Sequence, residues 1–358
     1  MNLSRLMLPL LLTLTILAGC SPTTLPEASP TPPAPTPTSP PPGAYFGTFY
    51  GQSVPSLGLY EQIGKTPAIS AHYLGWGGGF TTGLFDSNAR LGRISLVTWE
   101  YNARPGAEYE GRTLDAITDG VYDDSLADWA TRLAAFDKPI FLRWGHEMNG
   151  DWYPWGGANN GGGTLDGYGD PQQPDGPERF VAAYRYIHDL FAEHQADQVL
   201  WVWCPNAPFA TMDTSYGSTG WNRAENYYPG DEYVDWLCFD GYNWGTSAFG
   251  QQFNSRWQRF DQIFGESYVR LQALSPDKPI LIGEFASTED GGDKAAWVTD
   301  TFERLEQDYP QIRAIVWFHI NKETDWRMDS SPESLAAFQA ALDGNPYWLS
   351  SWPGLGEE

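Results

Sequence analysis

Eight short apolar runs recur along the chain from residue 44 onward, most of them followed by a stretch with helical spacing. They are AYFGTFYG (44–51), AISAHYLGW (68–76), RISLVTWEYN (93–102), KPIFLRWGHEMN (138–149), QVLWVWCPN (198–206), VDWLCFDGYNW (234–244), KPILIGEFAS (278–287) and RAIVWFHIN (313–321). These runs are rich in β-branched and aromatic residues and are mostly apolar on both faces. Strands that are buried on both sides of a parallel sheet have this composition, so we expect eight parallel strands.

The segments between the runs carry helical patterns. The clearest are Asp124 to Phe136, Pro177 to Gln195, Phe253 to Leu274, Lys294 to Asp308 and Ser334 to Leu342. Eight strands alternating with helices over about 300 residues predict an α/β fold, a single (β/α)8 TIM barrel. The alternative is a doubly wound open sheet, which usually has a glycine-rich phosphate loop after an early strand. The glycine-rich segments 76–83 and 156–164 match neither phosphate-loop pattern, so we interpret both as loops.

The N-terminal residues have the pattern of an export signal followed by a spacer. Arg5 precedes the apolar run Leu6 to Leu17, which is too short to span a bilayer and resembles a signal-peptide core. The sequence Leu-Ala-Gly-Cys ending at Cys20 resembles a bacterial lipoprotein box, with a lipid attached to the Cys20 thiol; the alternative is ordinary cleavage with Cys20 incidental. We expect a lipoprotein signal peptide (1–19), the lipidated cysteine with a Pro/Ser/Thr-rich linker (20–43) and a catalytic barrel (44–358).

The charge of the chain limits its partners. Its formal net charge is −24, which disfavours nucleic acid and anionic lipid surfaces because their phosphates would be repelled. Aromatic residues make up 15% of the chain, enough either to fill a large core or to line a groove for the flat faces of sugar rings. We expect a monomer that binds a neutral β-linked polysaccharide or oligosaccharide. Its contact with the membrane is through the lipid anchor alone, at the bacterial cell surface or on a periplasmic membrane face.

The cysteine and histidine residues predict no metal site and no cofactor. There is no CxxC pair, and HEMNG departs from the HExxH zinc pattern because residue 150 is glycine. Cys204 and Cys238 both lie near the ends of apolar runs. A disulfide and two buried thiols are both compatible with an exported protein.

Two carboxylates stand at equivalent strand ends. In a (β/α)8 barrel the chemistry lies at the carboxyl ends of the strands, where Glu147 lies at the end of the fourth run and Glu284 at the end of the seventh. An isolated glutamate there is more simply a helix cap or an ion-pair partner. Two carboxylates among aromatic residues instead favour glycoside hydrolysis, in which one carboxyl group donates a proton and the other is ionised.

Four segments together resemble glycoside hydrolase family 26. They are RWGHEMNGDWYPWG (143–156), FDGYNW (239–244), IGEFAS (282–287) and VWFHINKETDWR (316–327). The resemblance extends from about Tyr45 to Trp352. It implies a retaining endo-β-glycanase with Glu147 as general acid/base and Glu284 as nucleophile.

The resemblance also implies a set of substrate-binding residues. His146 matches a residue that orients the site, Trp152 an aromatic near the cleaved sugar, Tyr242 a hydrogen-bond donor to the nucleophile, and Trp317 the platform under that sugar. Asn149 is expected to meet a sugar hydroxyl. Trp99 and Glu100 lie near the end of the third run, and Glu100 either binds a sugar hydroxyl or pairs with Arg143 on the neighbouring strand.

The polymer itself is left open by these residues. The family is best known for β-1,4-mannanases, so mannan is the leading expectation. Mannanases tend to have Trp-His where this chain has Trp99-Glu100, and an aromatic residue where it has Pro154. These departures resemble members that cleave β-1,3-1,4-glucan or β-1,3-xylan. A different class of function, a non-catalytic glycan-binding lipoprotein, would explain the anchor and the aromatic residues but not both carboxylates.

Overall fold

The structure is a computed structural model that describes residues 43–51, 57–76, 82–101, 112–207 and 220–356. The expected signal peptide, Cys20 and nearly all of the linker lie outside these residues. So do Asn102 at the end of the third run and most of the glycine-rich segment 76–83. No helix among the described residues is both long enough and apolar enough to cross a membrane.

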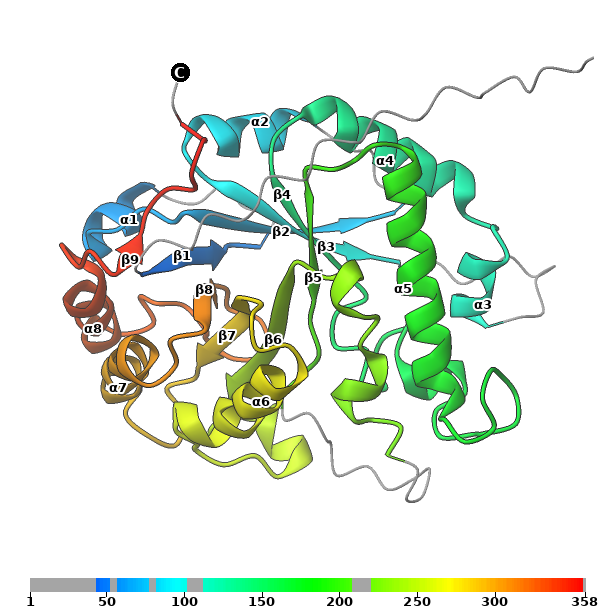
Figure 1. Ribbon diagram of the computed structural model, residues 1–358. Coiled ribbons are helices and arrows are strands. Elements are labelled where there is room, and N and C mark those ends of the chain that lie inside the picture. The colour runs from blue at the N-terminus through cyan, green and yellow to red at the C-terminus, as the bar shows by residue number, and fades with distance from the viewer. Residues whose placement is uncertain (1–42, 52–56, 77–81, 102–111, 208–219, 357–358) are drawn as a thin grey trace, which may run out of the picture. The chain divides into compact units, whose positions relative to one another are not determined.

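Eight parallel strands close into a barrel, as the apolar runs predict (Figure 1). The strands are β1 (Ala44–Phe49), β2 (Ile69–Gly75), β3 (Ile94–Glu100), β4 (Ile140–Trp144), β5 (Val199–Trp203), β6 (Trp236–Asn243), β7 (Ile280–Ser287) and β8 (Ile312–Phe318). Each strand pairs with the next in sequence, and β1 pairs with both β8 and β2, which closes the ring. A short strand that the sequence analysis did not predict, β9 (Trp348–Leu349), pairs with the start of β1.

Helices surround the barrel. The α-helices are α1 (Leu57–Ile63), α2 (Thr82–Arg90), α3 (Thr113–Thr118), α4 (Asp123–Phe136), α5 (Asp175–Glu193), α6 (Phe260–Leu274), α7 (Lys294–Gln307) and α8 (Pro332–Leu342). Four of the five predicted helices are confirmed to within two residues at each end. The fifth, α6, begins at Phe260 rather than at Phe253, because a separate 3-10 helix (Gly250–Phe253) ends at Asn254 in a left-handed conformation. Helices α1 to α3 were missed, and each has nine residues or fewer.

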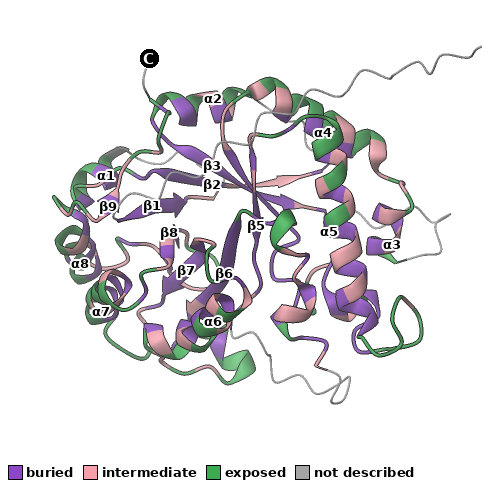
Figure 2. Cartoon of the chain, in the orientation of Figure 1, coloured by how far each residue is buried: buried purple, intermediate pink, exposed green. Residues whose placement is uncertain are grey.

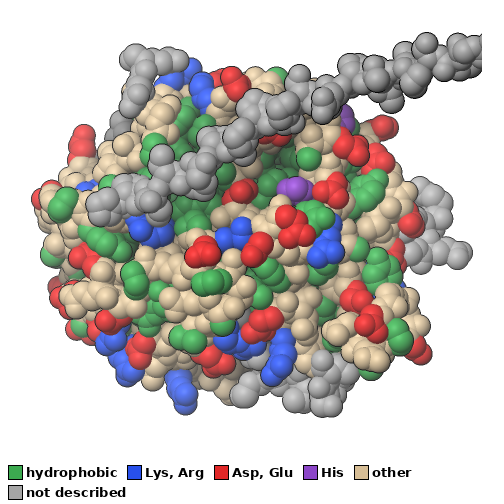
Figure 3. Space-filling model, viewed as in Figure 1, with side chains coloured by type: hydrophobic (Ala, Val, Ile, Leu, Met, Phe, Trp, Pro, Cys, Tyr) green, Lys and Arg blue, Asp and Glu red, His purple; other side chains and the backbone are tan. Residues whose placement is uncertain are grey.

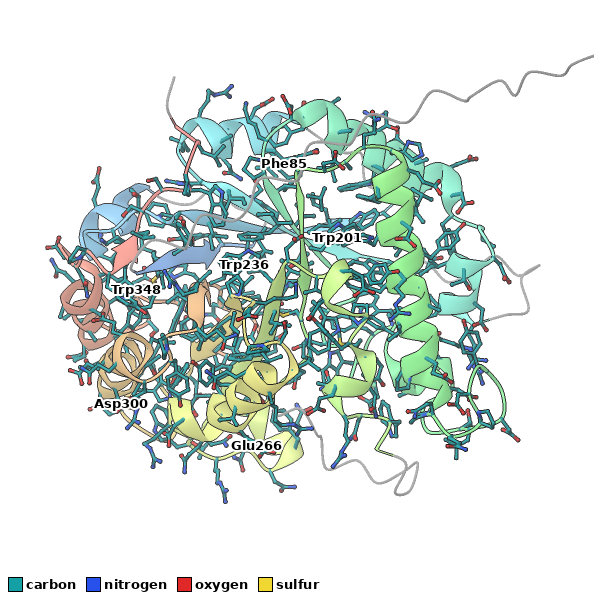
Figure 4. All side chains as sticks on the ribbon, viewed as in Figure 1. Phe85, Trp201, Trp236, Glu266, Asp300 and Trp348 are labelled. Carbon is teal, nitrogen blue, oxygen red and sulfur yellow. A yellow bond between two sulfur atoms is a disulfide. The ribbon has the colours of Figure 1, made fainter. Side chains whose placement is uncertain are left out.

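The core has two layers because strand side chains alternate between the barrel interior and the helices. Trp99 of β3 packs on Trp129 of α4, and Trp317 of β8 packs on Phe338 of α8. In Figure 2 the helices are buried where they face the strands and exposed on the outside. In Figure 4 Trp236 lies near the middle of the strand ring, whereas Glu266 and Asp300 lie on the outer helices. The face drawn in Figure 3 has interspersed acidic and basic side chains.

Candidate active site

Glu284 lies near the end of β7 and accepts hydrogen bonds on both carboxylate oxygens. Its Oε1 accepts from Nη2 of Arg143 at 2.5 Å and from the hydroxyl of Tyr73, and its Oε2 accepts from the hydroxyl of Tyr242 at 2.6 Å. Burial alone would raise the pKa of Glu284. The Arg143 charge and the two tyrosine hydroxyls outweigh burial and lower that pKa to about 2. Glu284 is therefore ionised at neutral pH.

Arg143 is held in place by residues of three other strands, β3, β6 and β7. Its Nη1 donates to both carboxylate oxygens of Asp240 at 2.8 and 2.7 Å, and its Nε and Nη2 donate to Oγ1 of Thr98 at 3.0 and 2.6 Å. The guanidinium passes against Gly283, where a Cβ atom would lie 2.6 Å from Nη1. The glycine before Glu284 thus gives the arginine room to reach the carboxylate. A buried pair of this kind needs every charge satisfied, and this arrangement provides that.

Glu147 lies in a tight turn directly after β4. It has a left-handed backbone with a φ of +53°, which is uncommon for a residue with a side chain and typical of functional sites. Its amide donates to the carbonyl oxygen of Cys204 at 2.7 Å, which ties the turn to the end of β5. The carboxylate accepts from Nδ2 of Asn206 at 2.6 Å and from Nε1 of Trp152 at 2.7 Å.

The two glutamates have opposite protonation preferences. Burial, and then the negative charge of Glu284, raise the pKa of Glu147 to about 7 even though Asn206 and Trp152 favour its ionised form. Two neighbouring carboxylates with pKa values pushed apart are the pattern expected of an acid and a nucleophile. Glu147 can hold a proton near neutral pH while Glu284 stays charged.

His146 and Tyr153 lie beside both carboxylates. Nε2 of His146 is 3.0 Å from the hydroxyl of Tyr153 and 4.0 Å from Oε1 of Glu284. Burial lowers the pKa of His146 to about 3, so this side chain is neutral. Burial, together with the charges of Glu147 and Glu284, raises the pKa of Tyr153. His146 therefore lies beside Glu284 without adding a charge, and its role in orienting the site stays a prediction.

Two more predicted site residues lie in the expected neighbourhood. Tyr242 donates its hydroxyl to Glu284, which is the contact that the family resemblance implies. Trp152 is 48% exposed beside the Glu147 carboxylate, so its indole ring is available to a ligand.

Glu100 is half-buried at the end of β3, and its charge adds to burial in raising the pKa of Tyr153. Arg143 ion-pairs with Asp240 and Glu284, so the alternative role of Glu100 as the partner of Arg143 is wrong.

Asn149 has a different role from the one expected. It is fully buried, its Nδ2 donates to the carbonyl oxygen of Asn206 at 3.0 Å, and its Oδ1 accepts from the amide of Asn206 at 2.8 Å. Both ends of the side chain are thus occupied by one backbone unit. Asn149 positions Asn206, whose own side chain holds Glu147, and it does not face a sugar.

Trp317 and Trp99 are core residues, which corrects their expected role in the site. Both are 0% exposed. Trp317 packs against Trp297 of α7 and Phe338 of α8, and its indole nitrogen donates to the carbonyl oxygen of Trp326. Because side chains alternate along a strand, its neighbour Phe318 faces the interior instead, with its ring centroid 5.6 Å from that of Tyr242.

A family comparison agrees with this geometry. The model of glycosyl hydrolase family 26 matches residues 54–266, more than half of the chain. The chain belongs to glycosyl hydrolase family 26. The match begins before β2 and ends within α6, so it includes Glu147, while Glu284 follows it on the next strand.

Curated relatives of this family 26 chain differ in the activities that their names state. Endoglucanase H of Acetivibrio thermocellus is 37% identical over 316 residues, which are 87% of this chain and 31% of that protein. Beta-1,3-xylanase TXYA of a Vibrio species is 28% identical over 65% of this chain and 43% of that protein. A mannan endo-1,4-beta-mannosidase of Bacillus subtilis is 27% identical over 52% of this chain. This chain spans about a third of the length of the endoglucanase.

Solved structures show the same fold. The Bacillus subtilis mannanase man26 has a TM-score of 0.56 and 22% identity, covering 88% of this chain and 90% of that one. A modular endo-beta-1,4-mannanase from Cellulomonas fimi has a TM-score of 0.59 and 19% identity, covering 88% and 73%. At these identities the likeness concerns the barrel fold alone.

Sequence reasoning missed several residues of this family 26 site. Tyr73 and Asn206 lie near or just after the ends of β2 and β5, the strands whose polar ends the sequence analysis left out. The strand-end rule that selected Glu147 and Glu284 would have found both. Tyr153 and Asp240 are also part of the site, and each adjoins or lies within a motif that already carried the resemblance.

Cys204 and Cys238 form a disulfide between β6 and the residue that follows β5. Their sulfur atoms and the Asp240 carboxylate lie within 4.8 Å of one another, the spacing of a possible metal site. The sulfurs are bonded to each other and Asp240 is paired with Arg143, so these ligand atoms are already committed. These three residues therefore form part of the surroundings that hold Arg143 in place.

Proposed function

We propose that this chain is a retaining endo-β-glycanase. One observation carries the proposal: two neighbouring carboxyl groups lie in opposite environments. Arg143 and two tyrosine hydroxyls bind Glu284 and lower its pKa, whereas burial and the charge of Glu284 raise the pKa of Glu147. A retaining glycosidase needs an ionised nucleophile and a protonated acid. Family membership supports the same assignment.

The proposed reaction has two steps. Glu284 attacks the anomeric carbon while Glu147 donates its proton to the departing glycosidic oxygen, which gives a covalent glycosyl-enzyme. Glu147, now ionised, then removes a proton from water as the water attacks the same carbon and releases Glu284. Arg143, Tyr73 and Tyr242 keep Glu284 ionised before the attack, whereas Asn206 and Trp152 fix the direction of the Glu147 carboxyl group.

The proposed substrate is a neutral β-glycan, with three candidates. The 37% identity to Endoglucanase H, together with Glu100 and Pro154 in place of residues usual in mannanases, favours a β-glucan containing 1,4 linkages. β-1,4-Mannan is the second candidate, supported by relatives named mannan endo-1,4-beta-mannosidase and by the mannanase structures. β-1,3-Xylan is the third, through two relatives named beta-1,3-xylanases.

One panel of substrates tests this proposal. Purified protein is incubated with mixed-linkage β-glucan, glucomannan, mannan and β-1,3-xylan, and the reducing ends and product lengths are measured. The wild type should release mixed oligosaccharides from at least one polymer, and Glu284→Ala should release none. Glu303→Ala, an exposed glutamate on α7, is the matched control and should behave as wild type. Binding without turnover by the wild type would instead indicate a glycan-binding protein.

The location of the enzyme is a separate proposal that rests on the first 43 residues. We propose that the chain is exported, lipidated at Cys20 and held away from a membrane by its proline-rich linker. The test is metabolic labelling with a fatty acid in a bacterial host. Wild type should carry the label and Cys20→Ser should not, and equal labelling of both would contradict the proposal.

A further inference from the structure

Three aromatic residues form a partly exposed cluster on the loop that connects β6 with α6. Phe249 and Phe253 are 39% and 51% exposed, and Trp244 beneath them is half-buried. The Phe249 ring packs against Trp244 at a tilt of 30° with centroids 5.1 Å apart, and Phe253 meets Trp244 edge-on at 5.5 Å. We call these three residues the rim cluster. Large aromatic rings left open to solvent in such a group usually mark a binding surface.

We propose that the rim cluster is a distal sugar-binding site for the same β-glycan chain that is cleaved between Glu147 and Glu284. This inference rests on the proposed function and deepens it, because it states where a glycan chain that extends beyond the catalytic centre is bound.

The rim cluster is continuous with the catalytic centre. Tyr242 donates its hydroxyl to Glu284, and its ring lies 5.5 Å from that of Trp244. Trp326, in the loop after β8, contacts both rings at 5.0 and 4.8 Å. An unbroken series of aromatic contacts therefore runs from the nucleophile to the exposed rings of Phe249 and Phe253, both at the strand ends where the substrate must lie.

The loop that carries the rim cluster is held firmly by its own hydrogen bonds. The amide of Thr246 donates to the carbonyl oxygen of Asp290 at 2.9 Å, which ties the loop to the one after β7. Oγ of Ser247 accepts from the amide of Gly250 at 3.1 Å, and Asn243 Oδ1 accepts from the amide of Gln258 at 3.0 Å. A ligand meeting the rim cluster thus meets a prearranged surface, which lowers the entropy cost of binding.

The surroundings of the rim cluster fit a neutral carbohydrate. Gln251, Gln252 and Asn254 are exposed beside the phenylalanine rings, and their amides can donate to and accept from hydroxyl groups. A β-linked sugar ring has apolar faces for aromatic stacking and hydroxyl groups around its edge. The formal net charge of −24 disfavours an acidic polysaccharide as the ligand.

The test compares one long substrate with one short substrate. Phe249→Ala, Phe253→Ala and the double variant are assayed on the polymer that the wild type hydrolyses best and on an aryl β-disaccharide of the same sugar. Val269→Ala is the control, since Val269 is 61% exposed on α6. Melting temperatures are recorded for all variants, and Phe253→Trp serves as the conservative replacement.

The expected result is a loss that depends on chain length. We expect kcat/KM on the polymer to fall about three- to tenfold for each alanine variant, because an aromatic contact contributes that much to affinity. Phe253→Trp should keep the wild-type value, and all variants should match the wild type on the disaccharide. Equal losses on both substrates, or an unchanged polymer rate, would overturn the inference and leave the proposed function standing.

If the wild type hydrolyses none of the polymers, the proposed function is contradicted, and a binding measurement then tests the rim cluster separately. The wild type and the same variants are run in native gels containing soluble mixed-linkage β-glucan or glucomannan, where slower migration measures binding without hydrolysis. Retardation of the wild type that is lost in the double variant supports the rim cluster as a sugar site. Retardation that is unchanged in the double variant, or absent in the wild type, overturns the inference.

Discussion

Nη2 of Arg143 lies 2.5 Å from Oε1 of Glu284, and the two side chains are only 1% and 9% exposed. The same guanidinium binds Asp240 through Nη1, so one cation on β4 connects the proposed nucleophile on β7 with a carboxylate on β6. In this buried setting the electrostatic effect of the cation is much larger than at the surface. The state of Glu284 therefore depends on Arg143 and on the two tyrosine hydroxyls beside it.

Removing one tyrosine hydroxyl should alter the pH dependence of activity. Tyr242→Phe deletes a hydrogen bond that favours the ionised form of Glu284, so the pKa of Glu284 rises. The acidic limb of kcat/KM should move to higher pH, and the rate at neutral pH should fall about tenfold or more. Tyr186→Phe is the control, because it removes a tyrosine–carboxylate bond to Asp123 far from the site. A profile unchanged by Tyr242→Phe would refute this role.

The alkaline limb should report Glu147. The acid must be protonated to act, and its pKa is about 7, so kcat/KM should decline as the pH rises through about 7. Asn206→Ala removes a bond that favours the ionised form of Glu147, so it should raise this pKa and move the limb to higher pH. Rates measured from pH 4 to 10 test both statements. A limb that moves to lower pH in Asn206→Ala would contradict the assignment.

Stability should depend on pH through the same group. The pKa of Glu147 is raised from 4.5 to about 7 on folding, so the folded state binds the proton more tightly. This contribution is fully present below pH 4.5 and is lost as the pH rises through 7. Glu147→Gln removes it, so wild type should lose on the order of 1–3 kcal/mol relative to this variant between pH 4.5 and 8. Urea unfolding of both proteins at the two pH values measures the difference, and parallel curves would argue against a raised pKa.

Asn149 and Asn206 should act as a unit. Because the side-chain hydrogen bonds of Asn149 within the described part of the chain go to the backbone of Asn206, Asn149→Ala should reduce kcat through misplacement of the Asn206 amide. The double variant should therefore be little worse than the poorer single variant, whereas independent residues give additive losses. Asn226→Ala, which removes a side-chain bond to the carbonyl oxygen of Gly220, is the control and should leave kcat unchanged.

The two tryptophans Trp317 and Trp152 should give opposite results. Trp317→Ala empties a core site between β8, α7 and α8, and it should lower the free energy of unfolding by about 3–5 kcal/mol. Trp152→Ala removes a 48% exposed ring beside Glu147, and it should weaken substrate binding with a smaller effect on unfolding. Chemical unfolding and KM, measured on both variants, separate the two roles. A raised KM in a fully stable Trp317→Ala protein would restore its role as a sugar platform.

The barrel and the two glutamates could be predicted because each depends on a local pattern. Apolar runs set the strands, and position at the strand end placed Glu147 and Glu284 at one rim. The direction in which each strand side chain points was harder to predict, since a shift of one residue turns a side chain from the barrel interior to the helices. Trp317 and Trp99 were misassigned for this reason, and Phe318 was overlooked.

Long-range pairings could not be predicted from the residues alone. The contacts from Arg143 to Asp240 and Glu284 join residues 97 and 141 positions apart, and they depend on the closed geometry of the ring. Asn149 was expected to bind sugar because it lies near a strand end, and the sequence does not show whether its side-chain amide already has partners. Only the position of the Asn206 backbone shows that these atoms are already used.

Azide rescue tests most directly whether Glu284 is the nucleophile and Glu147 the acid/base. Glu284→Ala and Glu147→Ala are each incubated with azide and an activated aryl β-glycoside of the sugar that the wild type cleaves. The glycosyl azide products are then analysed by NMR. In Glu284→Ala, azide should replace the missing carboxylate and give the α-glycosyl azide. In Glu147→Ala, azide should attack the glycosyl-enzyme formed on Glu284 and give the β-glycosyl azide. The β-azide from Glu284→Ala, or the α-azide from Glu147→Ala, would contradict the account.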